Sequence, residues 1–471
     1  MRIRHAAASV LAVLFAFAAA APVAAAAPDT GRHALTIDDI WAIQRVGAPA
    51  LSPDGTLAAY TVTAYDIEEN RGNADIWIVP VAGGPPRRLT ANKASDTQPA
   101  WSPDGRRIAF VSKRDDDKAS QIYVINVGGG EAERVTDLPL GASDPKWLPD
   151  GRRIVFVSHV VGGAGTPADT KKALEAREKN KVKAHVTENR LYRFWDRWLT
   201  DDEFPHLFVV DVAAKTSTDL TPGSKRLFDF QTGSGNFDVS PDGSTIVFEA
   251  NATPEPYRTI HSDLFAVPTA GGPVRDLTPG NPADDSSPVF SPDGKSVAYG
   301  LRVKAEDWPD RTRLAVLDLA SGQTRVLTEA WTDSPGGWRW TPDGRTILFR
   351  AEVQARGNLY AIPAAGGTPR LVSRGGTISA FEPTRDGRVV FASSTITAPP
   401  ELFVVGIDGK GLRALTTTND DRMKQIEAGE VKSFDFKGAG GDTVQMFVVY
   451  PPGFDPAKKY PLVQLIHGGP I

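Results

Sequence analysis

A short turn sequence, Pro-Asp-Gly, recurs along most of this chain and constrains its fold more than any other feature. Proline presets φ, aspartate bonds nearby backbone and glycine accepts positive φ, so each turn forms locally. In the seventh copy Arg replaces Pro. The successive spacings are 50, 46, 92, 51, 50 and 43 residues, and the turn aspartates are Asp54, Asp104, Asp150, Asp242, Asp293, Asp343 and Asp386.

Each turn is followed by two short runs of β-branched and aromatic residues, such as residues 108–111 and 122–127. These runs are too short for helices and are rich in strand formers. Most copies then end on Gly-Gly and a Leu-Thr or Val-Thr pair. A period of roughly 40–50 residues with about four strands per repeat is typical of a β-propeller. We therefore expect an all-β, seven-bladed β-propeller over residues 48–418.

The doubled spacing between Asp150 and Asp242 allows two interpretations: an eighth, degenerate blade or a long insertion. Residues 170–186, TKKALEAREKNKVKAHV, favour a helix and show no alternating strand pattern. Residues 206–212, HLFVVDV, supply the third strand that blade 3 still needs. Seven blades are favoured, with an insertion at 160–205 in blade 3.

The first residues have the layout of a secretory signal peptide. Arg2 and Arg4 precede an apolar run at 6–21, and small residues fill 23–27. We expect cleavage after a signal peptide of residues 1–26, which gives a periplasmic or secreted protein with no membrane association after cleavage. The alternative is an uncleaved anchor helix, for which the apolar run is short.

Composition excludes several kinds of site and partner. The chain has no Cys, so disulfides and thiolate metal sites are ruled out. Its net charge of −4 gives no reason to expect nucleic acid as a partner. The Asp-Gly turns lack the spacing of a calcium-binding loop, so we expect no metal. The sequence does not indicate an oligomeric state.

The segments on either side of the repeats differ from them. Residues 35–47 are expected to form a short helix, capped by Thr36, whose face of Ile37, Ile40 and Trp41 packs against the propeller rim. The polar residues 418–429 are interpreted as a linker. Beyond them, two strands lead into an apolar run at 462–466, as in the buried central strand of an α/β sheet. We expect residues 430–471 to be the truncated start of an α/β-hydrolase domain.

The apolar run at 462–466 is followed directly by His467, Gly468, Gly469 and Pro470. This order is similar to the strand-to-loop oxyanion motif of α/β-hydrolases. Glycine lets a backbone N–H approach a developing oxyanion with no side chain in between. Alone the motif is weak, since many strand-to-loop turns carry Gly-Gly-Pro.

The propeller repeats, the insertion and the lead-in YPPGFDPAKKYPLV together make the motif specific. This combination, over residues 35–471, resembles the prolyl oligopeptidase family of serine peptidases, more closely its acylaminoacyl-peptidase and dipeptidyl-peptidase branches. The resemblance implies a propeller that caps the hydrolase domain, short peptide substrates and no cofactor. It implies Gly469 as a backbone donor to the oxyanion, with His467, Gly468 and Pro470 shaping the loop.

The chain also departs from that family. No G-x-S-x-G occurs in its 471 residues, and the later Asp and His of a triad have no counterpart. Because nucleophilic catalysis needs a serine, a base and an orienting acid together, we expect this chain to be inactive alone. Two other interpretations stay open: a non-catalytic propeller binding module, like the periplasmic propeller proteins of cell-envelope complexes, and an inactive relative that keeps the fold.

Aminopeptidases of the family hold the free amine of the substrate with acidic side chains from a propeller insertion, and an Arg often binds a carbonyl. By resemblance the candidates here are Asp201, Asp202, Glu203, Arg190 and Arg193, with Arg197 nearby. A solvated, salt-bridged loop is the competing interpretation, and Glu68 with Glu69 is a rival acidic pair. The aromatic residues Tyr192, Phe194, Trp195 and Trp198 either line a pocket or fasten the insertion to the blade beneath it.

Overall fold

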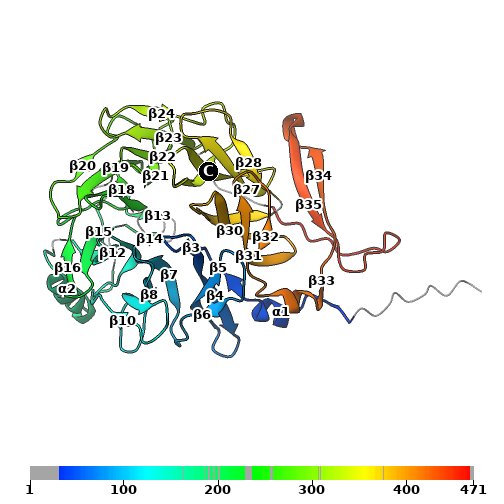
Figure 1. Ribbon diagram of the computed structural model, residues 1–471, viewed down its shortest axis with the longest axis horizontal. Helices are drawn as coiled ribbons and strands as arrows, with labels where there is room; N and C mark the ends of the chain where they lie inside the picture. The colour runs from blue at the N-terminus through cyan, green and yellow to red at the C-terminus, as the bar shows by residue number, and fades with distance from the viewer. Residues whose placement is uncertain are drawn as a thin grey trace, which may run out of the picture.

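A computed structural model describes residues 31–466, apart from residues 163, 185, 189, 190, 195, 196, 200, 201, 229–235, 255, 256, 258, 306, 308 and 375, and the side chain of residue 197. The expected signal peptide and residues 467–471 lie outside the described part. Seven antiparallel sheets stand around a ring (Figure 1), which confirms the seven-bladed β-propeller.

The first four blades follow the chain in order, each numbered from its innermost strand outward. Blade 1 contains β2 (Arg45–Val46), β3 (Ala50–Leu51), β4 (Leu57–Asp66), β5 (Arg71–Pro80) and β6 (Arg87–Arg88). Blade 2 contains β7 (Asp96–Trp101), β8 (Arg107–Ser112), β9 (Gln121–Asn126) and β10 (Glu133–Arg134). Blade 3 contains β11 (Ser143–Trp147), β12 (Arg153–Val161), β15 (Glu203–Asp211) and β16 (Thr216–Asp219), and blade 4 contains β17 (Phe237–Val239), β18 (Thr245–Asn251), β19 (Ser262–Pro268) and β20 (Arg275–Asp276).

The last three blades complete the ring. Blade 5 contains β21 (Asp285–Phe290), β22 (Ser296–Leu301), β23 (Arg313–Asp318) and β24 (Thr324–Val326). Blade 6 contains β25 (Pro335–Trp340), β26 (Thr346–Val353), β27 (Arg356–Pro363) and β28 (Arg370–Ser373). Blade 7 contains β29 (Thr377–Pro383), β30 (Arg388–Thr395), β31 (Ala398–Gly406) and β32 (Arg413–Ala414).

The hydrophobic core lies between blades, because side chains alternate across each strand. On β26, Ile347 and Phe349 pack toward blade 5, whereas Leu348 packs toward blade 7. Seven main clusters follow this rule, one for each pair of neighbouring blades. Every second strand carries a buried aromatic at the same position: Tyr60, Phe110, Phe156, Phe248, Tyr299, Phe349 and Phe391.

The Asp-Gly turns connect blades as well as strands. In the blade 2 turn, Ser102 Oγ donates to Asp104 Oδ1 at 2.5 Å and Gly105 has a φ of 68°. A Cβ added at Gly105 would lie 3.6 Å from Pro53 of the turn before it. The same approach of Gly to the preceding Pro recurs for Gly151, Gly243, Gly294 and Gly344. The repeat is therefore kept partly by contacts between neighbouring turns.

The Leu-Thr or Val-Thr pair that ends most blades also has a structural purpose. The Thr hydroxyl accepts a hydrogen bond from a backbone N–H of the third strand, as Thr328 Oγ1 does from Leu314 at 2.9 Å. Six blades contain this bond, through Thr90, Thr136, Thr221, Thr278, Thr328 and Thr416.

In the part of the chain that the structure describes, blades 7 and 1 exchange no strand where the ring closes. Instead, the segment before blade 1 contacts the segment after blade 7. The side chain of Asn419 accepts from the Gln44 N–H at 2.8 Å and donates to its carbonyl at 3.0 Å. Asp39 lies 3.3 Å from Arg422, and β1 (His33–Ala34) pairs in parallel with β33 (Ile426–Glu427).

Two expectations about these flanks were wrong. The predicted linker at 418–429 contains α3 (Asp420–Met423) and β33, and it forms half of this closure. The predicted helix at 35–47 is only α1 (Ile37–Ala42), because Arg45–Val46 joins the blade 1 sheet. Trp41 packs on Tyr65, but Ile37 is 72% exposed and Ile40 48%.

Beyond the ring, β34 (Val431–Lys437) and β35 (Thr443–Val449) form a hairpin around a 3₁₀ turn at Ala439–Gly441. Residues 462–466, expected as a buried strand, form no strand here, and Leu462, Val463, Leu465 and Ile466 are at least 80% exposed. A strand that is apolar on both faces needs neighbours that the described residues do not supply.

Candidate functional site

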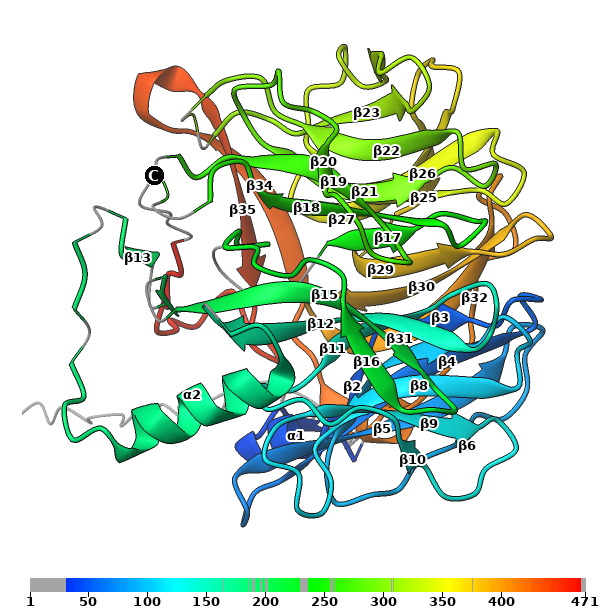
Figure 2. The ribbon, with the colours of Figure 1, turned by 90° about the vertical axis from the view of Figure 1, so that its left-hand side faces the viewer.

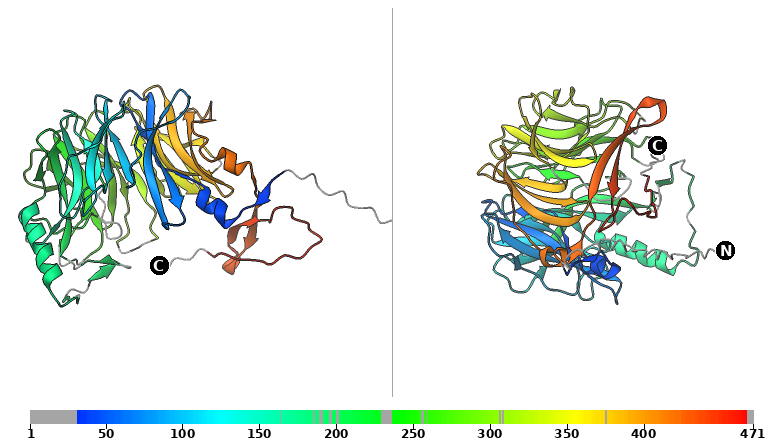
Figure 3. Two further views of the ribbon diagram at one scale, coloured as in Figure 1. Left: turned by 90° about the horizontal axis from the view of Figure 1, so that it is seen from below. Right: turned by 90° about the vertical axis from the view of Figure 1, so that its right-hand side faces the viewer.

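The segments that depart from the repeat lie on one side of the ring. The insertion joins the second strand of blade 3 to its third strand, whereas the Asp-Gly turns join first strands to second strands. In an antiparallel sheet these connections are at opposite ends. Helix α2 (Pro167–Lys179) of the insertion and the β34–β35 hairpin extend from the same side (Figures 2 and 3).

The insertion brings two of the predicted acidic residues together at the start of β15. Arg177 of α2 donates from Nη1 to Glu203 Oε1 at 2.9 Å, and its Nη2 lies 3.9 Å from Asp202 Oδ2. Asp202 has a φ of 58°, and a Cβ at Gly162 would meet its side chain. The acidic pair is therefore held in place by a guanidinium that the sequence did not identify.

The other predicted residues are placed differently. Arg193 is exposed on the short strand β13 (Arg193–Phe194), which pairs with β14 (Arg197–Trp198). Asp201, Arg190 and Trp195 lie outside the described residues, as do His467, Gly468, Gly469 and Pro470. Glu68 and Glu69 lie in the turn after β4, where both backbone N–H groups donate to the Asp66 carboxylate at 3.0 Å.

One aromatic residue of the insertion packs against residues outside it. Phe194 packs against a cluster that contains Phe204, Leu227 and Tyr257, so it contacts residues beyond blade 3. The rings of Tyr192 and Trp198 lie 5.5 Å apart. The contacts of Phe194 favour the interpretation that it anchors the insertion.

His206, at the centre of blade 3, is held on both ring nitrogens. Its Nδ1 lies 2.7 Å from Asp219 Oδ2, and its Nε2 lies 2.9 Å from the Ser224 carbonyl. The side chain is 1% exposed. Both nitrogens are engaged inside the blade, so the geometry gives His206 a structural role.

The innermost strands place one side chain of each blade at a common level: Ala50, Ala100, Lys146, Asp238, Val289, Arg339 and Glu382. Two ion pairs join neighbouring blades at this level. Lys146 Nζ lies 3.3 Å from Asp238 Oδ1, and Arg339 Nε lies 2.9 Å from Glu382 Oε1. The Glu382 charge raises the pKa of Arg339.

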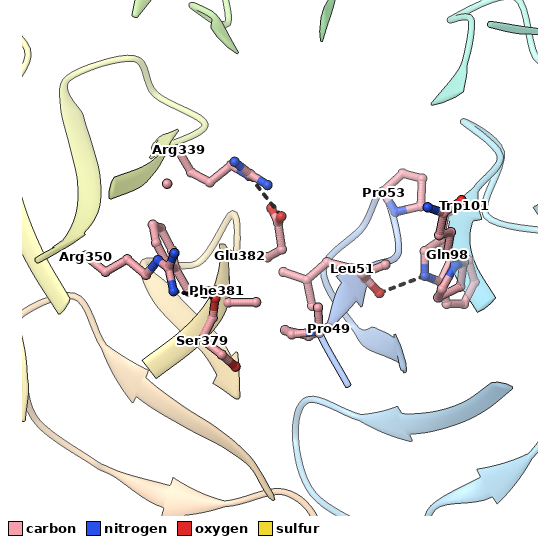
Figure 4. Close-up of a pocket in the computed structure, with 15 residues that line it drawn as sticks. Pro49, Leu51, Pro53, Gln98, Trp101, Arg339, Arg350, Ser379, Phe381 and Glu382 are labelled. Carbon is pink, nitrogen blue, oxygen red and sulfur yellow. Dashed lines mark hydrogen bonds and ion pairs between the residues drawn. The ribbon is translucent and has the colours of Figure 1, made fainter. Parts of the chain in front are cut away.

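A cavity of about 550 Å³ lies at the centre of the ring, between the inner strands of blades 6, 7, 1 and 2 (Figure 4). Its apolar wall includes Pro49, Leu51 and Phe381, and its polar wall includes Arg350. Sequence reasoning missed Arg350. A signal was present, because aligning the seven second strands on their aromatic shows a charged residue where most blades have a small or apolar one.

Blades 4 and 5 carry a second buried polar cluster. The pKa values of Asp263 and Asp285 are raised to about 7, mainly by burial and also by the nearby Asp276 carboxylate. Burial lowers the pKa of Arg226, whose guanidinium lies 4.5 Å from the Phe265 ring centre.

Among the described residues, no group of three His, Asp or Glu side chains is arranged to hold a metal. None of the helices in that part of the chain is long and apolar enough to cross a membrane.

Comparison with known proteins gives matches to one propeller family and to peptidases. Residues 41–176 match the family model of the TolB beta propeller domain. The chain is 30% identical over 458 residues to dipeptidyl-peptidase 5 of Porphyromonas gingivalis, covering 96% of this chain and 65% of that protein. It is 30% identical over 323 residues to probable dipeptidyl-peptidase 5 of Aspergillus clavatus, covering 62% and 44%. The chain thus spans less than two thirds of the length of either relative.

Solved structures share the fold. Acylaminoacyl peptidase of Pyrococcus horikoshii superposes with a TM-score of 0.66 at 19% identity, over 89% of this chain and 59% of that one. The propeller domain of the trilobed protease of Pyrococcus furiosus gives a TM-score of 0.54 at 17% identity, over 80% of this chain and 99% of that one. That domain is described as having an open velcro topology.

Proposed function

We propose that this chain belongs to the prolyl oligopeptidase family of serine peptidases and that it supplies the propeller and the first hydrolase strands of an exported peptidase of short peptides. Residues 430–471 would open the α/β-hydrolase domain, with the propeller over residues 48–418. The chain alone would not hydrolyse peptides, because no nucleophile motif is found in it.

The β34–β35 hairpin carries this proposal. Its register places Phe434 opposite Met446 and Phe436 opposite Val444, so one face is apolar, and these four side chains are 38% to 46% exposed. Phe447 lies on the other face of the hairpin. The guanidinium carbon of Arg356, in blade 6, lies over the Phe447 ring, 4.7 Å from the ring centre. An apolar sheet face needs a second layer, and the sheet of an α/β-hydrolase has one on each face.

In the proposed enzyme, the Gly469 N–H would stabilise the tetrahedral oxyanion, a contribution of about 10²–10³ in turnover. Asp202 and Glu203 would bind the free amine of the substrate from the propeller side. Arg177 supports this role by holding both carboxylates at one point. The narrow centre of the ring would exclude folded proteins.

The test compares the 471-residue chain with the product of its reading frame continued beyond the codon for Ile471. Dipeptidyl and acetylated aminoacyl coumarin amides report hydrolysis, and a fluorophosphonate probe reports a reactive serine. We expect the longer product to be active and labelled, and the 471-residue chain to be neither. A stop codon directly after Ile471, or a folded longer product without labelling, would contradict the peptidase proposal.

The amine-binding role has its own test in the longer product. Glu203→Gln should raise KM for free dipeptidyl substrates by about 10- to 100-fold, since it removes a charge-assisted bond. Acetylated substrates should be unaffected. Glu175→Gln, on the exposed side of α2, is the matched control. Equal effects on both substrate classes would assign Glu203 a structural role.

A second candidate function is a non-catalytic binding propeller. The observation that favours it is that the ring is closed by residues 33–46 and 419–427, without the hairpin. The same reading-frame test separates the two candidates.

A further inference from the structure

One second-strand position distinguishes blade 6 from most of the ring. It is the residue after the buried aromatic, and its occupants in blades 1 to 7 are Thr61, Val111, Val157, Glu249, Gly300, Arg350 and Ala392. Five blades have an uncharged, mostly small residue there. In blade 4, Glu249 accepts hydrogen bonds from Asn236 and from the Ser287 N–H, both at 2.9 Å. Arg350 is the cationic exception.

Glycine in the neighbouring strand lets Arg350 reach the cavity. Arg350 pairs with Gly336, and the register shifts between Gly336 and Trp338. Gly337 has a φ of 54°, and a Cβ there would lie 3.4 Å from Arg350 Nε. Because the inner strand has no side chain at these two positions, a side chain from the second strand lines the centre of the ring (Figure 4).

The Arg350 guanidinium has donors to spare. Its Nη1 donates to the Ser379 carbonyl at 2.9 Å and to the Ile378 carbonyl at 3.3 Å. Its Nε and Nη2 have no hydrogen-bond partner among the described residues, and no described carboxylate lies within 4.0 Å of it. Arg339, on the same wall, is paired with Glu382. Arg350 therefore brings an unbalanced positive charge and a planar pair of donors to the cavity.

The rest of the wall indicates which anion would fit. Pro49, Leu51 and Phe381 give the cavity an apolar side, and its volume of about 550 Å³ suits a small organic ligand rather than a bare ion. A phosphate would leave several oxygens without donors beside this wall. A carboxylate needs only one guanidinium, and an apolar side chain next to it would contact Phe381 and Leu51.

We propose that this cavity binds the carboxylate of a short peptide, with Arg350 as its anchor. The acidic pair of the insertion does not line this cavity. Binding at this cavity requires no hydrolysis, so it can be tested independently of the peptidase reaction.

Binding to the 471-residue chain tests the proposal. The probe is a fluorescein-labelled Ala-Ala-Leu tripeptide with a free C-terminus, measured by anisotropy at low salt against its C-terminal amide. The free acid should bind more tightly, and Arg350→Gln should weaken that binding by about 10- to 100-fold while leaving the amide unchanged. Arg350→Lys, which keeps the charge, should retain a preference for the acid.

Arg345→Gln is the matched control, because Arg345 lies on the exposed turn of the same blade. It should bind as the unsubstituted chain does. An amidated peptide that regains affinity through a Glu side chain would support the site and assign it to side-chain carboxylates. Equal affinity for acid and amide, or a folded Arg350→Gln protein with undiminished binding, would overturn the proposal.

Discussion

Asp285 gives the sharpest prediction for stability. It is fully buried at the start of β21, where Oδ1 accepts from Asn281 at 2.9 Å and Oδ2 has no hydrogen-bond partner among the described residues. Asp96 has the equivalent position in blade 2, and Arg114 neutralises it at 2.6 Å. No cation among the described residues pairs with Asp285, and its burial raises its pKa to about 7.

Because the pKa of Asp285 is raised in the folded protein, stability falls as the pH rises. The folded protein keeps the proton up to about pH 7, whereas the unfolded chain releases it near 3.8. The contribution of Asp285 to stability is therefore complete below pH 3.8 and is lost as the pH rises to about 7. At 1.36 kcal/mol for each pH unit the total is about 4 kcal/mol, of which about 3 kcal/mol falls between pH 5 and pH 8.

The variant Asp285→Asn keeps the acceptor for Asn281 and cannot ionise. Relative to the unsubstituted protein, its free energy of unfolding should rise by about 3 kcal/mol between pH 5 and pH 8. Removing this charge also relieves repulsion on Asp263, which acts in the same direction. Urea unfolding at several pH values measures the difference.

Asp242→Asn is the control for this experiment. Hydrogen bonds from Ser240 and Ser244 lower the pKa of Asp242 to about 2, so it is ionised at both pH 5 and pH 8. Its replacement should lower stability by the same amount at each pH. Parallel stability curves for Asp285→Asn and the unsubstituted protein over pH 5–8 would refute the reasoning.

Three further substitutions test the contacts that hold the ring, each measured by urea unfolding. Asn419→Ala leaves both backbone groups of Gln44 unpaired and should cost about 2–4 kcal/mol; a loss below 0.5 kcal/mol would show that the closure does not depend on it. Arg114→Met leaves Asp96 buried and unpaired and should cost about 3–5 kcal/mol, with part of the loss recovered by adding Asp96→Asn. Thr328→Val removes a buried hydroxyl acceptor and should cost about 1–2 kcal/mol, and unchanged stability would argue against the role given to the closing Thr.

The fold was predictable because its signals are local and repeated. A Pro-Asp-Gly turn requires only the bonds within a few residues, as between Ser102 and Asp104, and seven copies fix the number of blades. The contact of Gly105 with Pro53 was not predictable, since it joins residues of different blades. The strand at Arg45–Val46 was missed because its helical pattern is overridden by pairing with β4.

The candidate sites were less predictable, because their contacts join residues that are distant in the sequence. The acidic pair at 202 and 203 stands out as a charge run, but its partner Arg177 comes from a helix earlier in the insertion. Arg350 carries no local motif and becomes visible only when the seven second strands are aligned. The charge of Arg350 stands out because most other blades have an uncharged residue at the same position.

The two faces of the ring also differ in structure. On one face, consecutive Asp-Gly turns lie against each other, so a change in one turn must be accommodated by the next. The insertion with α2 and the β34–β35 hairpin extend from the opposite face (Figure 3). The acidic pair lies at the start of β15, whereas Arg350 lines the cavity at the centre of the ring. An extended peptide carries its positive and negative charges at opposite ends, so a propeller with carboxylates in its insertion and a guanidinium within the ring suits such a ligand better than a uniformly charged one.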